Sequence, residues 1–301
     1  MAVKKSIKEK IIKKQEQREK SLPKAEQKSE AKPCKISLCP KILLQREKRE
    51  IVDGRELILQ KQRKYYISDA SSGFTNQFGN IAGKDLLKYG PIGAGKIQNS
   101  NGRDFYVFPA TFIDQYKHLK KGPQTIPLKD IGLIISETGI DKDSVVLESG
   151  TGSAAVTCFL GRLVKKVITY ELRQDFAIAA QENINSIGLK NVVLKNKDFY
   201  LGCEEKENSF DLVVLDLPDP WKAIDTAERC VVPGGFIVSY SPNISQAMDM
   251  VNDIRKREKL VHTKTIEVME REWEIDARKV RPKSKSMIHS GYLSFARKIC
   301  Q

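Results

Sequence analysis

The stretch Val145-Val-Leu-Glu-Ser-Gly-Thr-Gly-Ser153 decides the fold that the sequence predicts. Its three leading apolar residues indicate a buried strand, and the acidic Glu148 closes that strand. Gly150 and Gly152 indicate a tight turn that lets the backbone approach a ligand, and the apolar run over 154–163 has helical length. Many strand-to-helix turns carry glycine only for their geometry. Whether these two glycines indicate a ligand site therefore depends on the residues that follow them at fixed distances.

After this stretch, segments typical of strands alternate with segments typical of helices. Such alternation implies right-handed crossovers and a parallel doubly wound sheet, so the predicted class is α/β. In this architecture a strand, a glycine turn and a helix bind a nucleotide-like cofactor at the carboxyl edge of the sheet. Predicted strands cover 167–171, 191–195, 210–216, 236–240, 263–269 and 291–297, and predicted helices cover 131–138, 176–187, 223–231 and 244–255.

Carboxylates follow successive predicted strands. Glu171 ends the second strand, where an acid accepts hydrogen bonds from a ribose diol, and Asp198 follows the third, within reach of the adenine end of a cofactor. Each acid alone is more often an ordinary loop residue, but several that face one crevice are harder to explain by chance. A dinucleotide and S-adenosylmethionine are both candidates, because 150–155 also satisfies the dinucleotide pattern. The two strands that close the chain favour a class I methyltransferase over a dehydrogenase.

The region over roughly 40–110 is expected to form a small, strongly twisted β domain. The segments 57–60 and 64–68 are expected to pair as a hairpin, and Asn101-Gly102 is a strong turn signal between 95–100 and 104–108. Gly90-Pro-Ile-Gly-Ala-Gly-Lys96 fits the glycine and lysine positions of a phosphate-binding P-loop. The next residue is isoleucine where that loop needs Ser or Thr, and a helix is not expected to come after it, so a P-loop is disfavoured.

Charge and cysteine content restrict the class further. The 301 residues carry a net charge of +14, and residues 1–35 contribute half of it with 12 Lys or Arg and 5 Asp or Glu. This tail is either solvated and disordered or an arm that attracts a polyanion such as RNA. The chain has neither an apolar run of membrane-spanning length nor a signal peptide, so we expect a cytoplasmic protein without membrane contact. Cys34 and Cys39 lack a second pair at metal-ligand spacing, so no metal site is expected.

The most specific segment is Asp216-Leu-Pro-Asp-Pro-Trp221, a stiff loop at the end of the central strand. By itself it would be a proline turn, but in this context it stands where a substrate base meets a methyl donor. The sequence also holds Tyr170-Glu171, Gly122-Pro-Gln124 with Lys129-Asp130, Ser239-Tyr-Ser-Pro-Asn-Ile-Ser-Gln246 and Arg281-Pro282…His289-Ser-Gly-Tyr292. Together with the glycine turn, these motifs resemble the tRNA (adenine-N1)-methyltransferases that modify adenosine 58 in the T loop. The resemblance covers about residues 55–299.

The resemblance implies a class I (Rossmann-like) S-adenosylmethionine-dependent methyltransferase fold with a small N-terminal β domain. The expected boundaries are a basic tail over 1–40, which lies outside the resemblance, a β domain over 41–111 and a catalytic domain over 112–301. It further implies S-adenosylmethionine as cofactor, tRNA as partner, a homotetramer of the archaeal and bacterial type, and methylation of adenosine 58, with adenosine 57 left open. The alternatives are a methyltransferase for another nucleic acid or a protein, and a non-catalytic tRNA-binding subunit. The intact glycine turn, Glu171 and Asp216 argue against a non-catalytic subunit.

Carried over residue by residue, the family motifs assign Asp216 as the catalytic carboxylate. Two positions depart from the family pattern: Ala154 replaces a usual glycine, and Pro127-Leu128 replaces an aromatic-or-His–Pro pair. The implied cofactor contacts are Glu148, Ser149, Gly150, Thr151, Gly152, Ser153, Glu171, Asp198, Asp216 and Gln124. The implied substrate contacts are Pro218, Trp221, Tyr240, Asn243 and His289.

Overall fold

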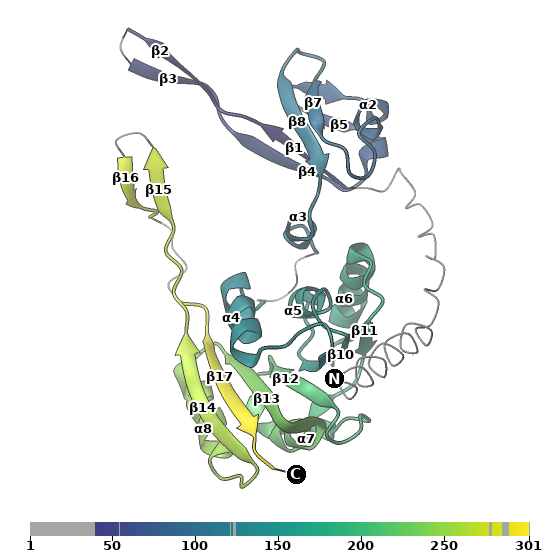
Figure 1. Ribbon diagram of the computed structural model, residues 1–301, viewed down its shortest axis with the longest axis vertical. Coiled ribbons are helices and arrows are strands. Elements are labelled where there is room, and N and C mark those ends of the chain that lie inside the picture. The colour runs from purple at the N-terminus through teal and green to yellow at the C-terminus, as the bar shows by residue number, and fades with distance from the viewer. Residues whose placement is uncertain are drawn as a thin grey trace, which may run out of the picture. The chain divides into compact units, whose positions relative to one another are not determined.

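The computed structural model describes residues 40–53, 55–120, 122, 125–276, 279–284 and 289–300 (Figure 1). The basic tail with Cys34 and Cys39, and the candidate cofactor residue Gln124, lie outside these residues. The chain divides into two compact units. The first unit runs up to Arg63 and continues with Ile67–Pro109, and the second comprises Lys64–Tyr66 and everything from Ala110 onward.

The first unit is built on a four-stranded sheet in the order β4-β1-β8-β7. These strands are β4 Arg63–Ile67, β1 Lys41–Gln45, β8 Asp104–Pro109 and β7 Gly95–Gln98. Phe105 and Val107 of β8 are fully buried while Tyr106 between them is partly exposed, as a sheet with one covered face requires. The hairpin of β5 Phe74–Asn76 and β6 Gly79–Ile81, and the short helices η2 Ala70–Ser72 and α2 Gly83–Leu87, also belong to this unit.

One predicted hairpin in this unit is confirmed and another is wrong. The strands β7 and β8 pair antiparallel across the turn at Asn101-Gly102, where Gly102 has a φ of 71°. In contrast, β3 Arg55–Gln60 does not pair with β4 but with β2 Lys48–Val52, a strand absent from the prediction. The reason is that the whole of β2 is exposed. Its residues therefore show no alternation of apolar and polar side chains that would mark a strand.

The second unit contains a seven-stranded sheet in the order β11-β10-β9-β12-β13-β17-β14. The first five strands are parallel, and β17 pairs antiparallel with both β13 and β14. This topology confirms the doubly wound sheet and the two closing strands. The strands are β9 Val145–Ser149, β10 Lys166–Tyr170, β11 Val192–Lys195, β12 Phe210–Leu215, β13 Val231–Ser241, β14 Leu260–Glu267 and β17 Tyr292–Lys298.

Helices cover both faces of this sheet (Figure 1). On one face lie α4 Leu128–Thr138, α5 Ala155–Leu160 and α6 Gln174–Ile187, and on the other lie α7 Ile224–Cys230 and α8 Ile244–Ile254. Successive residues of β12 supply both cores, because Leu212 and Val214 pack with α4 and α5 while Val213 and Leu215 pack with α7 and α8. Burial on both faces explains the continuous apolar runs of these strands.

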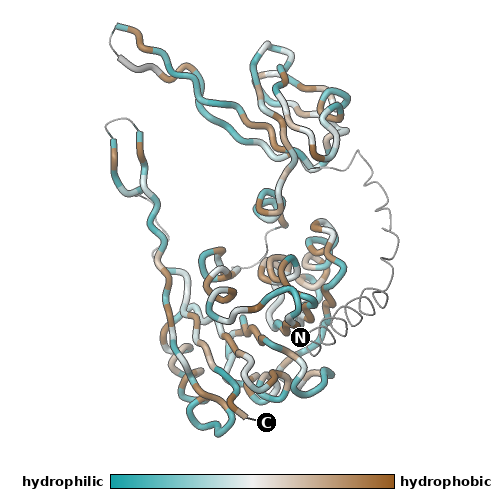
Figure 2. Tube along the Cα trace, in the orientation of Figure 1, coloured by the Kyte–Doolittle hydropathy of each residue, from teal (hydrophilic) through white to brown (hydrophobic). Residues whose placement is uncertain are grey.

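A second exposed hairpin was also not predicted from the sequence. It consists of β15 Trp273–Asp276 and β16 Lys279–Pro282 and extends away from the end of the seven-stranded sheet (Figure 1). Hydrophobic and hydrophilic residues are mixed along it (Figure 2). Among the described residues, no helix is long and apolar enough to cross a membrane.

Candidate active site

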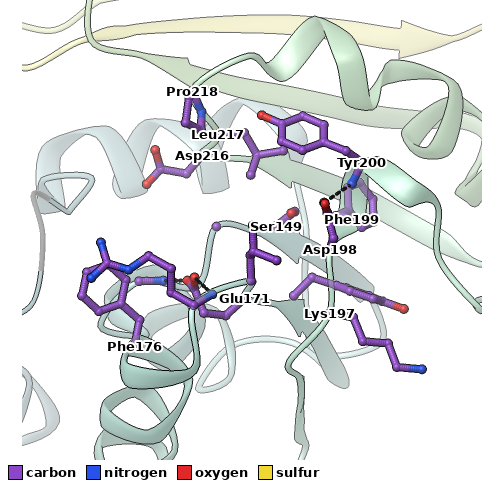
Figure 3. Close-up of a pocket in the computed structure, with 15 residues that line it drawn as sticks. Ser149, Glu171, Phe176, Lys197, Asp198, Phe199, Tyr200, Asp216, Leu217 and Pro218 are labelled. Atoms are coloured by element: carbon purple, nitrogen blue, oxygen red, sulfur yellow. Dashed lines mark hydrogen bonds between the residues drawn. The ribbon is translucent and has the colours of Figure 1, made fainter.

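A cavity of about 360 Å³ lies at the carboxyl ends of β9, β10 and β12 and at the loop after β11. This is the edge at which open α/β sheets bind their ligands, and the volume falls in the usual range for small-molecule sites. The residues predicted at these strand ends converge on it (Figure 3): its lining includes Ser149, Gly150, Glu171, Asp198, Asp216 and Pro218.

The glycine turn brings β9 and β12 into close contact. Asp216 donates its backbone N–H to Ser149 O at 2.9 Å. Gly150 has a φ of 94°, and a Cβ there would lie 2.0 Å from Asp216 O, so no side chain fits at this position. Gly152 also has a positive φ but has open space around it. Ala154, at the start of α5, has a φ of 60°, a left-handed conformation that glycine adopts most easily. This explains why the family pattern has glycine at this position.

Glu171 is held in place by two backbone donors. Gly152 N–H donates to its Oε2 at 2.8 Å, and Arg173 N–H donates to its Oε1 at 2.9 Å. The side chain lines the cavity, and each carboxylate oxygen retains a lone pair for a further donor. This arrangement suits recognition of two neighbouring hydroxyl groups, as on a ribose.

Asp198 and the proline loop are linked through Tyr200. Asp198 lies at the start of the short helix η3 Phe199–Leu201, where its Oδ1 accepts the Tyr200 N–H at 2.9 Å (Figure 3). The Tyr200 hydroxyl in turn accepts the Asp219 N–H at 3.1 Å. The segment after β11, which forms one wall of the cavity, and the loop after β12 are therefore held together by Tyr200.

Asp216 has an unusual protonation equilibrium. Its half-buried carboxylate points toward the open part of the cavity beside Pro218 (Figure 3). Burial, with a smaller contribution from the negative charge of Glu171, raises its pKa from 3.8 to about 7. The ionised form is therefore poorly solvated until a cation or a hydrogen-bond donor approaches it.

Three of the residues predicted to contact the cofactor do not line the cavity. Glu148 is buried and accepts the Thr157 hydroxyl of α5 at 2.6 Å, and burial raises its pKa to about 8. The Thr151 hydroxyl is 2.6 Å from that of Thr169, and Ser153 O accepts the side-chain amide of Asn183 at 2.8 Å. Through these hydrogen bonds, Glu148, Thr151 and Ser153 tie the end of β9 and the glycine turn to α5, β10 and α6.

Of the five predicted substrate contacts, only Pro218 is among the residues that line the cavity. The other four make structural contacts elsewhere in the second unit. Trp221 lies in the short helix η4 Pro220–Ala223 and packs against the core. Asn243 caps α8 by accepting the Gln246 N–H at 3.0 Å. His289 Nε2 is 3.0 Å from Pro242 O, and a hydrogen bond with Glu267 raises the pKa of its imidazole.

A buried polar cluster joins the remaining family motifs. Tyr240 donates its hydroxyl to Ser290 O at 2.5 Å, and Ser290 donates its own hydroxyl to Asp130 Oδ2 at 2.7 Å. Lys129 Nζ lies 2.8 Å from Asp130 Oδ1 and donates to Ser290 Oγ and to Val268 O, both at 2.6 Å. The sequence shows these residues only as distant motifs, because local patterning carries no information about contacts between segments so far apart.

The cavity also contains residues that sequence reasoning missed. Leu172, Phe176, Lys197, Tyr200 and Leu217 line it alongside the predicted residues. The signal that could have found four of them is their position, since they lie within three residues of a predicted strand-end acid. Phe176, on the first turn of α6, has no such signal because a helix turn brings it back to the cavity.

The residues of the cavity fit S-adenosylmethionine. Gly150 and Gly152 leave the backbone open to a ligand, Glu171 offers its carboxylate to a ribose diol, and Asp216 offers a carboxylate to a cationic sulfur. Fold and site thus define a class I S-adenosylmethionine-dependent methyltransferase. Similar solved structures agree: an S-adenosylmethionine-dependent O-methyltransferase from Thermotoga maritima has a TM-score of 0.70 at 25% identity, with 87% of this chain and 93% of that chain covered. A tRNA (m1A58) methyltransferase from Aquifex aeolicus has a TM-score of 0.68 at 23% identity, with 86% and 97% covered.

The sequence comparisons identify the family. The model of the tRNA methyltransferase complex GCD14 subunit family matches residues 116–284, so the chain belongs to this family. A tRNA (adenine(57)-N(1)/adenine(58)-N(1))-methyltransferase from Methanocaldococcus jannaschii is 31% identical over 271 residues, which cover 80% of this chain and 93% of the relative. A tRNA (adenine(58)-N(1))-methyltransferase from Thermus thermophilus is 29% identical over 242 residues, which cover 78% and 92%.

Proposed function

We propose that this protein transfers the methyl group of S-adenosylmethionine to N1 of adenosine 58 in the T loop of tRNA. The observation that carries the proposal is the Asp216 carboxylate, which faces a cavity of cofactor size from the stiff loop after β12. The relatives named for this reaction span most of the chain and support the same substrate. A protein or another nucleic acid as substrate is not favoured by these relatives.

Each part of the cavity has a proposed role toward the cofactor. Glu171 would accept hydrogen bonds from the ribose hydroxyls, and Asp198 would contact the adenine end. The turn at Gly150 and Gly152 would allow the backbone to approach the rest of the molecule. When bound, S-adenosylmethionine supplies an electrophilic methyl group on a positively charged sulfur. Thr157 and Thr169 hold Glu148 and Thr151 and so keep the turn in shape.

Asp216 would act on the adenine ring. N1 of adenine is weakly basic, so no proton has to be removed before it attacks. Positive charge grows on the ring during the reaction, and a fixed carboxylate in a water-poor site stabilises that charge. The same carboxylate can accept a hydrogen bond from the exocyclic N6 amine and thereby orient N1. A base that is stacked within folded tRNA has to be flipped out of its stack before its N1 can reach Asp216.

Nucleoside analysis tests the proposed reaction. The purified protein is incubated with isotopically labelled S-adenosylmethionine and three tRNA transcripts: one unmodified, one with guanosine in place of adenosine 58, and one with guanosine in place of adenosine 57. We expect labelled 1-methyladenosine from the first and third transcripts and none from the second, by mass spectrometry of the digested nucleosides. Equal labelling of the second transcript would contradict adenosine 58 as the target. A partial decrease of the label in the third transcript would add position 57, which the name of the Methanocaldococcus relative includes.

We also propose that the protein assembles as a homotetramer in the cytoplasm, where it meets tRNA. In support, the β15–β16 hairpin exposes apolar side chains at Trp273, Ile275 and Val280, of which Ile275 is 76% exposed. Exposed apolar side chains gathered on one arm are typical of protein interfaces. Light scattering on the wild type and on Ile275→Glu/Val280→Glu tests this assembly. We expect four copies for the wild type and fewer for the variant, and a monomeric wild type would refute it.

A further inference from the structure

Two turns of the first unit are locked together by one buried side chain. Asn99, which is 6% exposed, donates its side-chain amide to Phe78 O at 2.7 Å. Its Oδ1 accepts the backbone N–H groups of Asn101 at 3.1 Å and Arg103 at 2.9 Å. Phe78 lies in the turn between β5 and β6, and Arg103 lies in the turn between β7 and β8. Asn99 therefore sets the position of Arg103 relative to the Phe78 ring.

Two guanidinium groups share that ring. The guanidinium carbons of Arg103 and of Arg63, at the start of β4, each lie 4.4 Å from the centroid of Phe78. The two positive charges are therefore separated by at most twice that distance. All three side chains are half-buried. Cation–π attraction orients both guanidinium groups on one aromatic surface.

Within the part of the chain that the structure describes, no carboxylate lies at ion-pair distance from either arginine. Neither forms an ion pair there, whereas arginines elsewhere do, as Arg173 does with Asp175 and Arg257 with Asp253. Like charges at this separation repel each other, and an anion that binds both removes the repulsion. Guanidinium groups bind phosphate oxygens through parallel N–H donors, which makes a phosphodiester the anion that fits.

We propose that Arg63 and Arg103, held on Phe78, form a phosphate clamp that grips the backbone of the tRNA substrate. This proposal rests on the proposed function, which makes RNA the polyanion that this basic protein meets. RNA helices are recognised mainly through phosphates and 2′-hydroxyls. A pre-oriented pair of guanidinium groups can therefore bind the RNA backbone without contacts to specific bases. The alternative is a purely structural role, in which the arginines only cover Phe78.

Salt-dependent tRNA binding separates these two roles. The variants are Arg63→Gln, Arg103→Gln and the double variant, with the tRNA dissociation constant measured over a series of salt concentrations. Removal of one phosphate contact should lower the slope of log K against log salt by about 0.7–0.9. We expect that decrease for each arginine and at least about a tenfold weaker affinity for the double variant at low salt. The dissociation constant for S-adenosylmethionine should not change.

Two further variants serve as controls. Arg297→Gln removes a guanidinium that lies 4.9 Å from the Phe236 ring in the second unit, and it should leave the salt slope unchanged. Phe78→Leu keeps both charges but removes the aromatic support, so it should weaken tRNA binding with a nearly unchanged slope.

An unchanged slope in the double variant would overturn the clamp, and a lowered melting temperature alongside it would assign the arginines a structural role. Methylation by the wild-type preparation is measured in parallel. If the wild type binds tRNA through the arginines without forming 1-methyladenosine, the proposed reaction fails while the clamp stands. If it methylates tRNA and the variants bind normally, the clamp fails alone.

Discussion

Three carboxylates at the ends of neighbouring strands have three different environments. Glu148 is buried and hydrogen-bonded to a threonine, with a pKa that burial raises, and Glu171 is fixed by two backbone N–H groups. Asp216 is half-buried and faces the cavity, with a pKa raised to about 7 by burial and by Glu171. Different environments of chemically similar groups are how an active site separates structural, binding and catalytic roles.

The Asp216→Asn variant tests the catalytic carboxylate. Asparagine keeps the shape and can still accept a hydrogen bond, but it cannot stabilise positive charge on adenine. Removal of one such electrostatic group typically slows the chemical step by about a hundredfold or more. We expect that decrease in single-turnover methylation of tRNA at saturating cofactor. Calorimetry should also find a weaker cofactor affinity, because the ionised carboxylate attracts the cationic cofactor. Wild-type turnover at saturating cofactor would remove Asp216 from the chemical step and leave it a cofactor ligand only.

The raised pKa of Asp216 predicts pH-dependent cofactor binding. The folded protein prefers the protonated carboxyl, so the stability that depends on this group falls as pH rises from about 4 to about 7. A cationic ligand prefers the ionised form, so binding of S-adenosylmethionine should release protons near neutral pH and weaken below about pH 7. Calorimetry in buffers of different ionisation enthalpy measures this release. Asp216→Asn should reduce it, and identical proton release in both proteins would exclude Asp216 as its source, leaving Glu148 as the other raised carboxyl.

Glu171 offers a test of the ribose site. Glu171→Ala removes the acceptor for two sugar hydroxyls and should raise the dissociation constant for S-adenosylmethionine at least tenfold, since hydrogen bonds to a charged group are each worth about 1.5–3 kcal/mol. The matched control is Asp175→Ala, an exposed acid in the following helix that pairs with Arg173. We expect calorimetry to detect no change in the control. Equal affinities in all three proteins would place the ribose elsewhere.

At the scale of elements, the buried cluster around Lys129 and Asp130 connects parts of the sheet and its helices. It joins the start of α4 to the end of β13 through Tyr240, to the segment after β14 through Val268, and to the segment before β17 through Ser290. The side chains of Lys129 and Asp130 are only 7% and 1% exposed. When a charge pair is buried so deeply, removing either partner leaves the other as an uncompensated buried charge and destabilises the fold.

This dependence gives a stability prediction. Lys129→Met removes the positive partner and leaves Asp130 as an uncompensated buried charge, which costs about 3–5 kcal/mol of the free energy of unfolding. The double variant Lys129→Met/Asp130→Leu removes both charges and should recover a large part of that cost. Urea denaturation of the three proteins measures the difference. Equal stability of the wild type and Lys129→Met would show that the pair is not coupled.

At the scale of the whole molecule, charge is unevenly distributed. Residues 1–35, outside the described part of the chain, carry half of the net charge of +14. Deletion of these residues should weaken tRNA binding and reduce its salt dependence without affecting cofactor affinity, because the attraction is electrostatic and independent of sequence. A variant of full length with the tail lysines changed to glutamine is the matched control and should behave like the deletion. An unchanged salt slope in both variants would reject a role for the tail.

Local patterning was sufficient for the central sheet and for the position of the cavity. The strands β9 and β12 are buried on both faces, so their apolar runs stand out in the sequence. Gly139 and Gly188, which end α4 and α6 in the left-handed conformation, are equally visible. The acids Glu171 and Asp216 were located because parallel strands bring their carboxyl ends to one edge.

By itself, then, the sequence determined the fold class, the family and the edge of the sheet that forms the cavity. Only the tertiary structure decided which carboxylates line that cavity and that Glu148 is instead hydrogen-bonded to Thr157 of α5, since this depends on contacts between separate elements. It also decided the pairing of β2 with β3 and the existence of the β15–β16 hairpin, because exposed strands need no apolar pattern. The Lys129 cluster and the pair of arginines on Phe78 arise from contacts between distant segments, and such contacts leave no periodic signal in a chain.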